Sequence, residues 1–207
     1  MKLFNLSLQI NGFPIRKAKK ELSNILAVSE ADFPIYLETK KNEIVAYHVQ
    51  NNPFYNSIVG GKPIEKWEDI PVMRKIHFQK PLQERLSKGY TKSNVYINKT
   101  SGSSGDPFVF AKDKFCHALI WANIMRRFEW YSIDFNHSLQ ARFYGMPLDF
   151  IANKKLRLKD FLSHRYRFNI FDFSEEAMGR MLSKFQNTRF DYINGYTGSI
   201  VLLAKFL

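Results

Sequence analysis

The sequence predicts an α/β protein with a mainly helical N-terminal region, residues 1–92, followed by a mixed sheet with alternating helices in residues 93–207. Three observations predict this fold class. Apolar residues in the front third recur at helical spacing. From Ser93 the spacing changes to the period of two that is typical of strands. Short β-favouring runs then alternate with residues that start helices, which indicates parallel pairing in an α/β layer.

Two segments of the N-terminal region, 17–27 and 44–54, have the apolar spacing of helices. The second is expected to break at Pro53, because proline disfavours the helical conformation in the residue before it. Further prolines punctuate the following stretch and leave room only for short helices, which are expected at 64–68 and 73–78.

A pair of strands is expected where the pattern changes. Val95 and Ile97 alternate with polar residues, and residues 108–110 resume an extended pattern after a loop of small residues. Asp113 is a suitable N-cap for a helix that runs to about Tyr131, because its carboxylate can accept from an unpaired N–H group of the first turn. The loop therefore joins two strands just ahead of a long helix.

The remainder of the chain is expected to continue this alternation. Three more strands are expected, at residues 139–143, 168–171 and 190–193. Ser174, followed by two glutamates, favours a helix start, and another helix opens at Gly198. This last helix is apolar and reaches Leu207 without a cap, so we expect the sequence to be part of a longer protein.

Composition excludes several classes of protein. The chain has 207 residues, 45% of them hydrophobic, which is enough for a core. Its single cysteine, Cys116, excludes an internal disulfide and a cysteine metal cluster, and the scattered histidines predict no metal site. Because the sequence has neither a signal peptide nor a continuous run of about 20 apolar residues, we expect a cytoplasmic protein without a membrane span.

The formal net charge of +12 would attract any polyanion. Basic residues cluster at 16–20, at 154–159, and at Arg165 and Arg167. Charge runs are weak motifs, so solvated helix faces are favoured over a dedicated nucleic-acid surface.

The loop between the first two strands is the strongest candidate for a binding site. It consists of Thr100, Ser101, Gly102, Ser103, Ser104 and Gly105. Glycine lets backbone N–H groups approach a phosphate closely, and hydroxyl groups add further donors. Gly105 is followed by Asp106 and Pro107 rather than by lysine, so the loop is not a Walker A motif. From composition alone, a plain flexible turn remains the alternative.

The run Thr-Ser-Gly-Ser-Ser-Gly-x-Pro, from Thr100 to Pro107, resembles the phosphate loop of the adenylate-forming superfamily. Within that superfamily the chain looks most like phenylacetate–CoA ligases and their relatives in capsular polysaccharide biosynthesis. The supporting segments of the resemblance, which spans residues 47–207, are Asn52–Tyr55, Trp67–Lys75, Phe171–Glu176 and Gly195–Ser199. Two departures are Phe108, where the superfamily often has lysine, and Thr197, where proline is common.

The resemblance implies part of a larger adenylate-forming domain and an ATP-dependent, AMP-forming ligase. Such an enzyme uses ATP and Mg²⁺ to activate a carboxylic acid as an acyl-adenylate, and often passes it to coenzyme A. The loop from Thr100 to Gly105 would then bind the ATP phosphates. The family's later motifs, including its catalytic lysine, do not occur before Leu207, so these residues alone are expected to show little adenylation activity.

A second candidate loop follows the expected strand at 190–193. Gly195, Tyr196 and Ser199 would border the acyl or coenzyme A pocket, because ligands favour the carboxyl ends of strands in open α/β sheets. An ordinary strand-to-helix turn is the alternative for this loop. For the whole chain, the alternative function is a non-catalytic basic module that binds nucleic acid or a partner in polysaccharide assembly.

Overall fold

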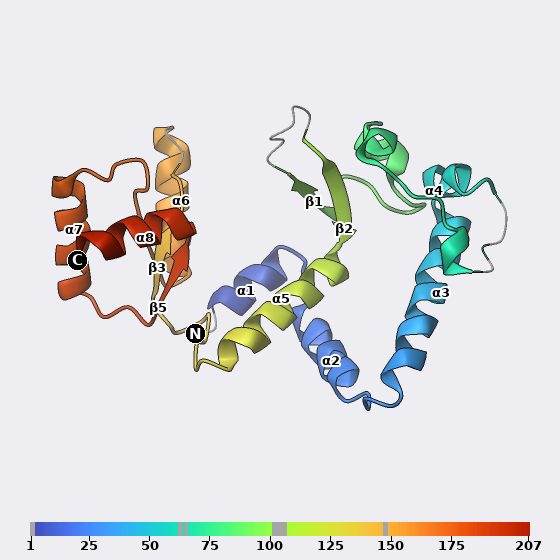
Figure 1. The fold of residues 1–207 in the computed structure, drawn as a ribbon, viewed down its shortest axis with the longest axis horizontal. Coiled ribbons are helices and arrows are strands. Elements are labelled where there is room, and N and C mark those ends of the chain that lie inside the picture. Colours follow the sequence, from blue (N-terminus) through green and yellow to red (C-terminus); the bar gives the residue numbers. More distant parts are fainter. Residues whose placement is uncertain (1–2, 62–63, 65, 101–106, 147–148) are drawn as a thin grey trace. The chain divides into compact units, whose positions relative to one another are not determined.

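The computed structural model describes residues 3–61, 64, 66–100, 107–146 and 149–207. Packing divides the chain into two compact units (Figure 1). One consists of Gly12–Ala122, and the other combines Met1–Asn11 with Asn123–Leu207. The boundary expected between residues 92 and 93 follows the change in secondary structure, whereas these two units are defined by packing contacts. The fold is α/β, as the sequence predicts.

Within the described residues of the 12–122 unit, helices precede the strands. The α-helices are α2 (Ile15–Leu26), α3 (Phe33–Asn51) and α4 (Pro53–Ile58), and the 3₁₀ helices are η1 (Trp67–Asp69), η2 (Lys75–Phe78) and η3 (Leu82–Arg85). The expected break before Pro53 is confirmed, because α3 ends at Asn51 and Asn52 is extended, with φ −118° and ψ 100°. The helix begins at Phe33, earlier than the apolar spacing predicts.

The two strands of this unit form an antiparallel hairpin, β1 (Val95–Lys99) with β2 (Val109–Asp113). The pairing extends one step further, since Thr100 N donates to Phe108 O at 2.9 Å. Helix α5 (Lys114–Glu129) follows directly, and its start is capped by Asp113, whose Oδ1 accepts from Cys116 N at 2.6 Å. Both the hairpin and the predicted N-cap are confirmed.

The second unit contains a parallel three-stranded sheet with the order β4-β3-β5. Its elements are α1 (Leu3–Ile10), β3 (Gln140–Phe143), α6 (Phe150–Leu162), β4 (Arg165–Phe168), α7 (Glu175–Gln186), β5 (Tyr192–Gly195) and α8 (Thr197–Phe206). Ser174 caps α7, as predicted, because its Oγ accepts from Ala177 N at 3.3 Å. The strand expected at residues 139–143 is confirmed as β3, whereas β4 and β5 are shifted by two or three residues from the expected 168–171 and 190–193. Helices α1 and α6 were not predicted from the sequence.

The two faces of this sheet have opposite chemistry. One face carries Ala141, Phe143 and Phe168, which pack with Met181 of α7 and Leu203 of α8 in a buried core. Alternation along the strands places the polar residues on the other face, namely Gln140, Arg142, Arg165, Arg167, Tyr192 and Asn194. Hydrophobic burial against α7 and α8 therefore fixes which face carries the arginines.

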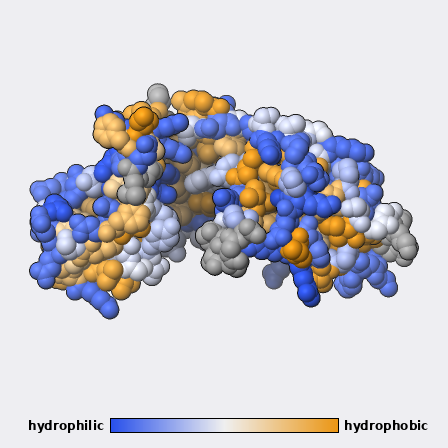
Figure 2. Space-filling view, turned by 90° about the horizontal axis from the view of Figure 1, so that it is seen from above, coloured by the Kyte–Doolittle hydropathy of each residue, from blue (hydrophilic) through white to orange (hydrophobic). Residues whose placement is uncertain are grey.

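Two expectations about the fold are corrected. The sequence predicted one mixed sheet, but the antiparallel hairpin and the parallel sheet are separate and belong to different units. Arg165 and Arg167 were expected on a solvated helix face, yet they lie on β4, and Arg167 is only 8% exposed. In the space-filling view, apolar side chains are interspersed among polar ones on both units (Figure 2). No helix in the described parts of the chain has the length and apolarity needed to cross a membrane.

Candidate functional site

The first predicted site is the segment that lies between strands β1 and β2 in the sequence. Its residues Ser101, Gly102, Ser103, Ser104 and Gly105 fall outside the described residues. Thr100 is described, and its Oγ1 accepts a hydrogen bond from Phe108 N at 2.9 Å. A threonine hydroxyl can accept and donate at once, so Thr100 can still give its proton to a ligand oxygen.

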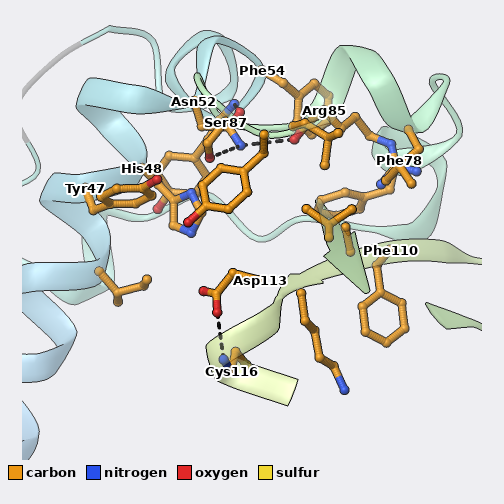
Figure 3. A pocket seen from close by; sticks show the side chains of 18 of the residues that line it. Tyr47, His48, Asn52, Phe54, Phe78, Arg85, Ser87, Phe110, Asp113 and Cys116 are labelled. Atoms are coloured by element: carbon orange, nitrogen blue, oxygen red, sulfur yellow. Dashed lines mark hydrogen bonds between the residues drawn. The ribbon is translucent and has the colours of Figure 1, made fainter. Parts of the chain in front are cut away.

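A cavity of about 460 Å³ lies beside the hairpin within the same unit (Figure 3). Its wall is formed by α3, α4, the 3₁₀ helices η2 and η3, strand β2 and the start of α5. The side chains labelled in the close-up include Tyr47, His48, Asn52, Phe54, Phe78, Arg85, Phe110 and Cys116. Aromatic rings therefore dominate the lining, and Arg85 contributes a guanidinium group.

Asn52 fixes one wall of the cavity by three hydrogen bonds. Its Oδ1 accepts from Tyr55 N at 2.9 Å, which caps α4. Its Nδ2 donates to Arg85 O at 3.0 Å and to Ser87 Oγ at 3.2 Å. Asn52 is 7% exposed, so its side chain joins the α3–α4 break to the segment after η3 through buried polar contacts.

Arg85 connects this wall to the hairpin. Its Nη2 donates to Val109 O at 2.7 Å, and its Nε donates to Lys80 O at 2.9 Å. Burial lowers the pKa of its guanidinium, which nevertheless remains charged at neutral pH. The cavity thus shares a structural residue with β2, the strand that begins two residues after Pro107.

Two other titratable groups of the cavity, His48 and Cys116, have pKa values that are shifted by burial. Burial lowers the pKa of His48, whose Nδ1 is buried without a hydrogen-bond partner. Burial and the nearby Asp113 carboxylate raise the pKa of the Cys116 thiol. A protonated thiol is a poor nucleophile, so the cavity has the chemistry of a binding pocket for an apolar or aromatic group rather than that of a covalent catalyst.

The second predicted site, Gly195, Tyr196 and Ser199, lies in the other unit at the β5–α8 step. A Cβ atom on Gly195 would lie 2.8 Å from Phe143 Cα and would collide with Phe143 O and Cβ, so strand packing explains this glycine. Tyr196 is 58% exposed, and its ring centroid lies 5.1 Å from that of Tyr144. Ser199 is 9% exposed, and only Tyr196 of the three presents a large accessible side chain.

Comparisons with protein-family models, with curated proteins and with solved structures gave no significant match. The described residues hold no group of three or more histidine, cysteine, aspartate or glutamate side chains that could hold a metal ion. The cavity residues His48 and Arg85 were not singled out from the sequence. The signal present there was the Asn52–Pro53 helix break, which predicted a change of direction and no binding role.

Proposed function

We propose that this chain carries the triphosphate-binding loop of an ATP-dependent, AMP-forming ligase that activates a carboxylic acid as an acyl-adenylate. The observation that carries this proposal is the position of the resemblance motif in a hairpin. The last β1–β2 hydrogen bonds join Thr100 to Phe108, so the Ser/Gly run connects two paired strands. Such a run of small residues suits a backbone that donates N–H groups to phosphate oxygens.

The chain's own groups would act by positioning and by neutralising charge. Thr100 would donate its hydroxyl proton to a phosphate oxygen, and the hairpin would hold the loop by strand pairing. In the reaction, a substrate carboxylate oxygen bonds to the α-phosphorus of ATP and the bond to pyrophosphate breaks. Mg²⁺, which would enter with ATP, is usually held by one or two carboxylates together with the substrate phosphates and several waters. Positioning and electrostatics supply most of the rate in such chemistry.

Binding of ATP with Mg²⁺, followed by isothermal titration calorimetry, tests the proposal. The double variant Gly102→Ala/Gly105→Ala should lose at least roughly tenfold in affinity, because added methyl groups obstruct the approach of phosphate to the backbone. Gly179→Ala is the matched control, since a Cβ atom at that helical position meets nothing within 4 Å. Equal ATP affinity in all three proteins would refute the role of the loop.

The same titration addresses the alternative of a basic binding module. Salt-sensitive binding of a polyanion, with no binding of ATP by the unaltered chain, would favour that alternative over the ligase.

A further inference from the structure

The polar face of the parallel sheet gathers three guanidinium groups in one small area. Arg142 of β3 is the register partner of Arg167 of β4, and Gln140 is the partner of Arg165. Residues two apart on a strand share a face, so Arg165 and Arg167 lie on the side of Arg142. Burial is the largest cause that lowers the pKa values of Arg142 and Arg165. Neighbouring arginines of this group also lower both pKa values, whereas Asp160 raises both.

A single carboxylate in the described chain offsets this charge at contact distance. Asp160 of α6 receives Arg167 in a two-pronged pair, with Nε–Oδ2 at 2.6 Å and Nη2–Oδ1 at 3.1 Å. Asp191 lies at the amino end of β3, where its Oδ2 accepts from Leu139 N, and no ion pair between the described residues joins it to these arginines. Two positive charges therefore remain on the sheet face, and partly buried charges without counter-charge are costly.

The remaining guanidinium groups have unused donors. Arg142 donates from Nη1 to Gln140 Oε1 at 3.0 Å, while its Nε is buried without a partner. Arg165 Nε is also buried without a partner, and its guanidinium carbon lies 5.7 Å from the ring centroid of Phe4. Buried polar groups are normally satisfied, so unpaired N–H groups on two neighbouring arginines indicate a missing acceptor.

Arg142 also reaches the carboxyl edge of the sheet, which is the edge at which open α/β sheets usually bind ligands. Its guanidinium carbon lies 4.2 Å from the ring centroid of Tyr144, and Tyr144 donates its hydroxyl to Asn194 Oδ1 at 3.2 Å. Tyr144 directly follows β3, and Asn194 is the penultimate residue of β5. Arg142 is only partly buried as a residue, and its guanidinium group lies near the carboxyl ends of two adjacent parallel strands.

We propose that this arginine face binds a phosphoryl dianion, with Arg142 and Arg165 as its ligands and Arg167 held in place by Asp160. The two uncompensated positive charges match the charge of a phosphate group, which approaches −2 at neutral pH. Guanidinium groups recognise phosphate through paired N–H donors. These arginines belong to the unit of residues 1–11 and 123–207, whereas the hairpin loop belongs to the other unit, and the proposal does not depend on ATP binding by that loop.

Calorimetric titration of the full chain with inorganic phosphate and with phenyl phosphate tests this site. Acetate at matched ionic strength serves as the monovalent comparison. We expect both phosphates to bind and acetate to bind at least roughly tenfold more weakly, because a monoanion leaves one charge uncompensated. If inorganic phosphate and phenyl phosphate bind with equal affinity, the result would indicate free phosphate as the ligand. Tighter binding of phenyl phosphate would indicate a phosphate ester. Equal binding of acetate and phosphate would overturn the proposal.

Variants assign the binding to these residues. Arg142→Gln should weaken phosphate binding roughly tenfold or more, since it removes a charge-assisted donor. Arg157→Gln is the control, because Arg157 is an exposed arginine of α6 in the same unit. Gly102→Ala/Gly105→Ala should keep the phosphate binding even where it loses ATP. Equal affinity of Arg142→Gln and the unaltered chain would overturn the assignment.

NMR of the unaltered chain provides a test that needs no variant at the site. The Nε–Hε signals of Arg142 and Arg165 should shift as inorganic phosphate is added, and that of Arg157 should stay in place. Signals of Arg142 and Arg165 that do not move at saturating phosphate would refute the site, whatever the stability of the variants.

Discussion

The buried ion pair between Asp160 and Arg167 offers the sharpest test of the charge on the sheet face. Asp160→Asn removes the carboxylate and leaves the guanidinium with its geometry almost unchanged. The two side chains are 5% and 8% exposed, so solvent cannot replace the lost partner. Arg167 would then join Arg142 and Arg165 as a third uncompensated charge.

The expected loss follows from this burial. Removing one partner of a buried pair costs about 3–5 kcal/mol of unfolding free energy, most of it from the charge left behind. Replacing both partners by apolar residues of similar size is often neutral. The double variant Asp160→Leu/Arg167→Met should therefore recover most of the stability, because it also removes repulsion on Arg142.

Urea unfolding followed by circular dichroism measures these free energies. Glu176→Gln is the matched control: Glu176 accepts from Arg180 at the same 2.6 Å, but the two side chains are 86% and 60% exposed. An exposed pair contributes at most about 1 kcal/mol. A loss below 1 kcal/mol for Asp160→Asn, or a double variant less stable than either single variant, would refute the description of this face as short of negative charge.

Three further predictions concern stability and are measured by urea unfolding. Gly195→Ala should lower the free energy of unfolding by about 3 kcal/mol or more, because the added Cβ atom meets the backbone of the paired strand. Gly179→Ala should stay within about 1 kcal/mol of the unaltered chain. Similar effects of the two substitutions would contradict the close packing of Gly195 on Phe143. Asn52→Ala should lower the free energy of unfolding by about 2–4 kcal/mol, because it removes one buried and two partly buried hydrogen bonds. Asn51→Ala, whose side-chain hydrogen bond is exposed, should lower it by less than about 1 kcal/mol. Equal losses would be inconsistent with Asn52 as an anchor of the cavity wall. Burial lowers the pKa of His117, whose Nε2 accepts from an indole N–H at 3.1 Å. As the pH falls, this histidine is therefore protonated in the unfolded chain before it is protonated in the folded chain, so the free energy of unfolding should decrease below about pH 6.5. The decrease should be smaller in His117→Gln, and an unchanged slope in that variant would argue against the role of His117.

Elements with strong local signals could be predicted from the sequence. The hairpin strands have alternating or β-branched residues, and Asp113 and Ser174 are caps whose hydrogen bonds depend only on nearby N–H groups. The break at Pro53 is likewise a local steric effect. Such features need no knowledge of the tertiary fold, and all of them are confirmed.

Features that depend on tertiary contacts could not be predicted in this way. The strands β4 and β5 are only four residues long, which is too short for a periodic signal to fix their positions, and they were expected two or three residues away. Helix α6 has exposed apolar residues such as Phe150 and Phe161 on a basic segment, so amphipathic spacing does not reveal it. The assignment of the hairpin and the parallel sheet to separate units likewise depends on packing.

The second predicted loop and the arginine face meet at the carboxyl end of the parallel sheet. The sequence placed a ligand there because glycine and tyrosine follow a strand, but the glycine is required by the packing of Gly195 on Phe143. What remains is Tyr196, whose exposed ring lies beside Tyr144, the residue under the Arg142 guanidinium. From the sequence, Arg165 and Arg167 were noted only as a basic cluster on a solvated helix face, and Arg142 was not singled out. Because each of these arginines alternates with an apolar or aromatic neighbour, strand pairing is needed to bring them onto one face. A ligand at this edge would therefore contact Arg142 of the arginine face and be bordered by Tyr196 of the predicted loop.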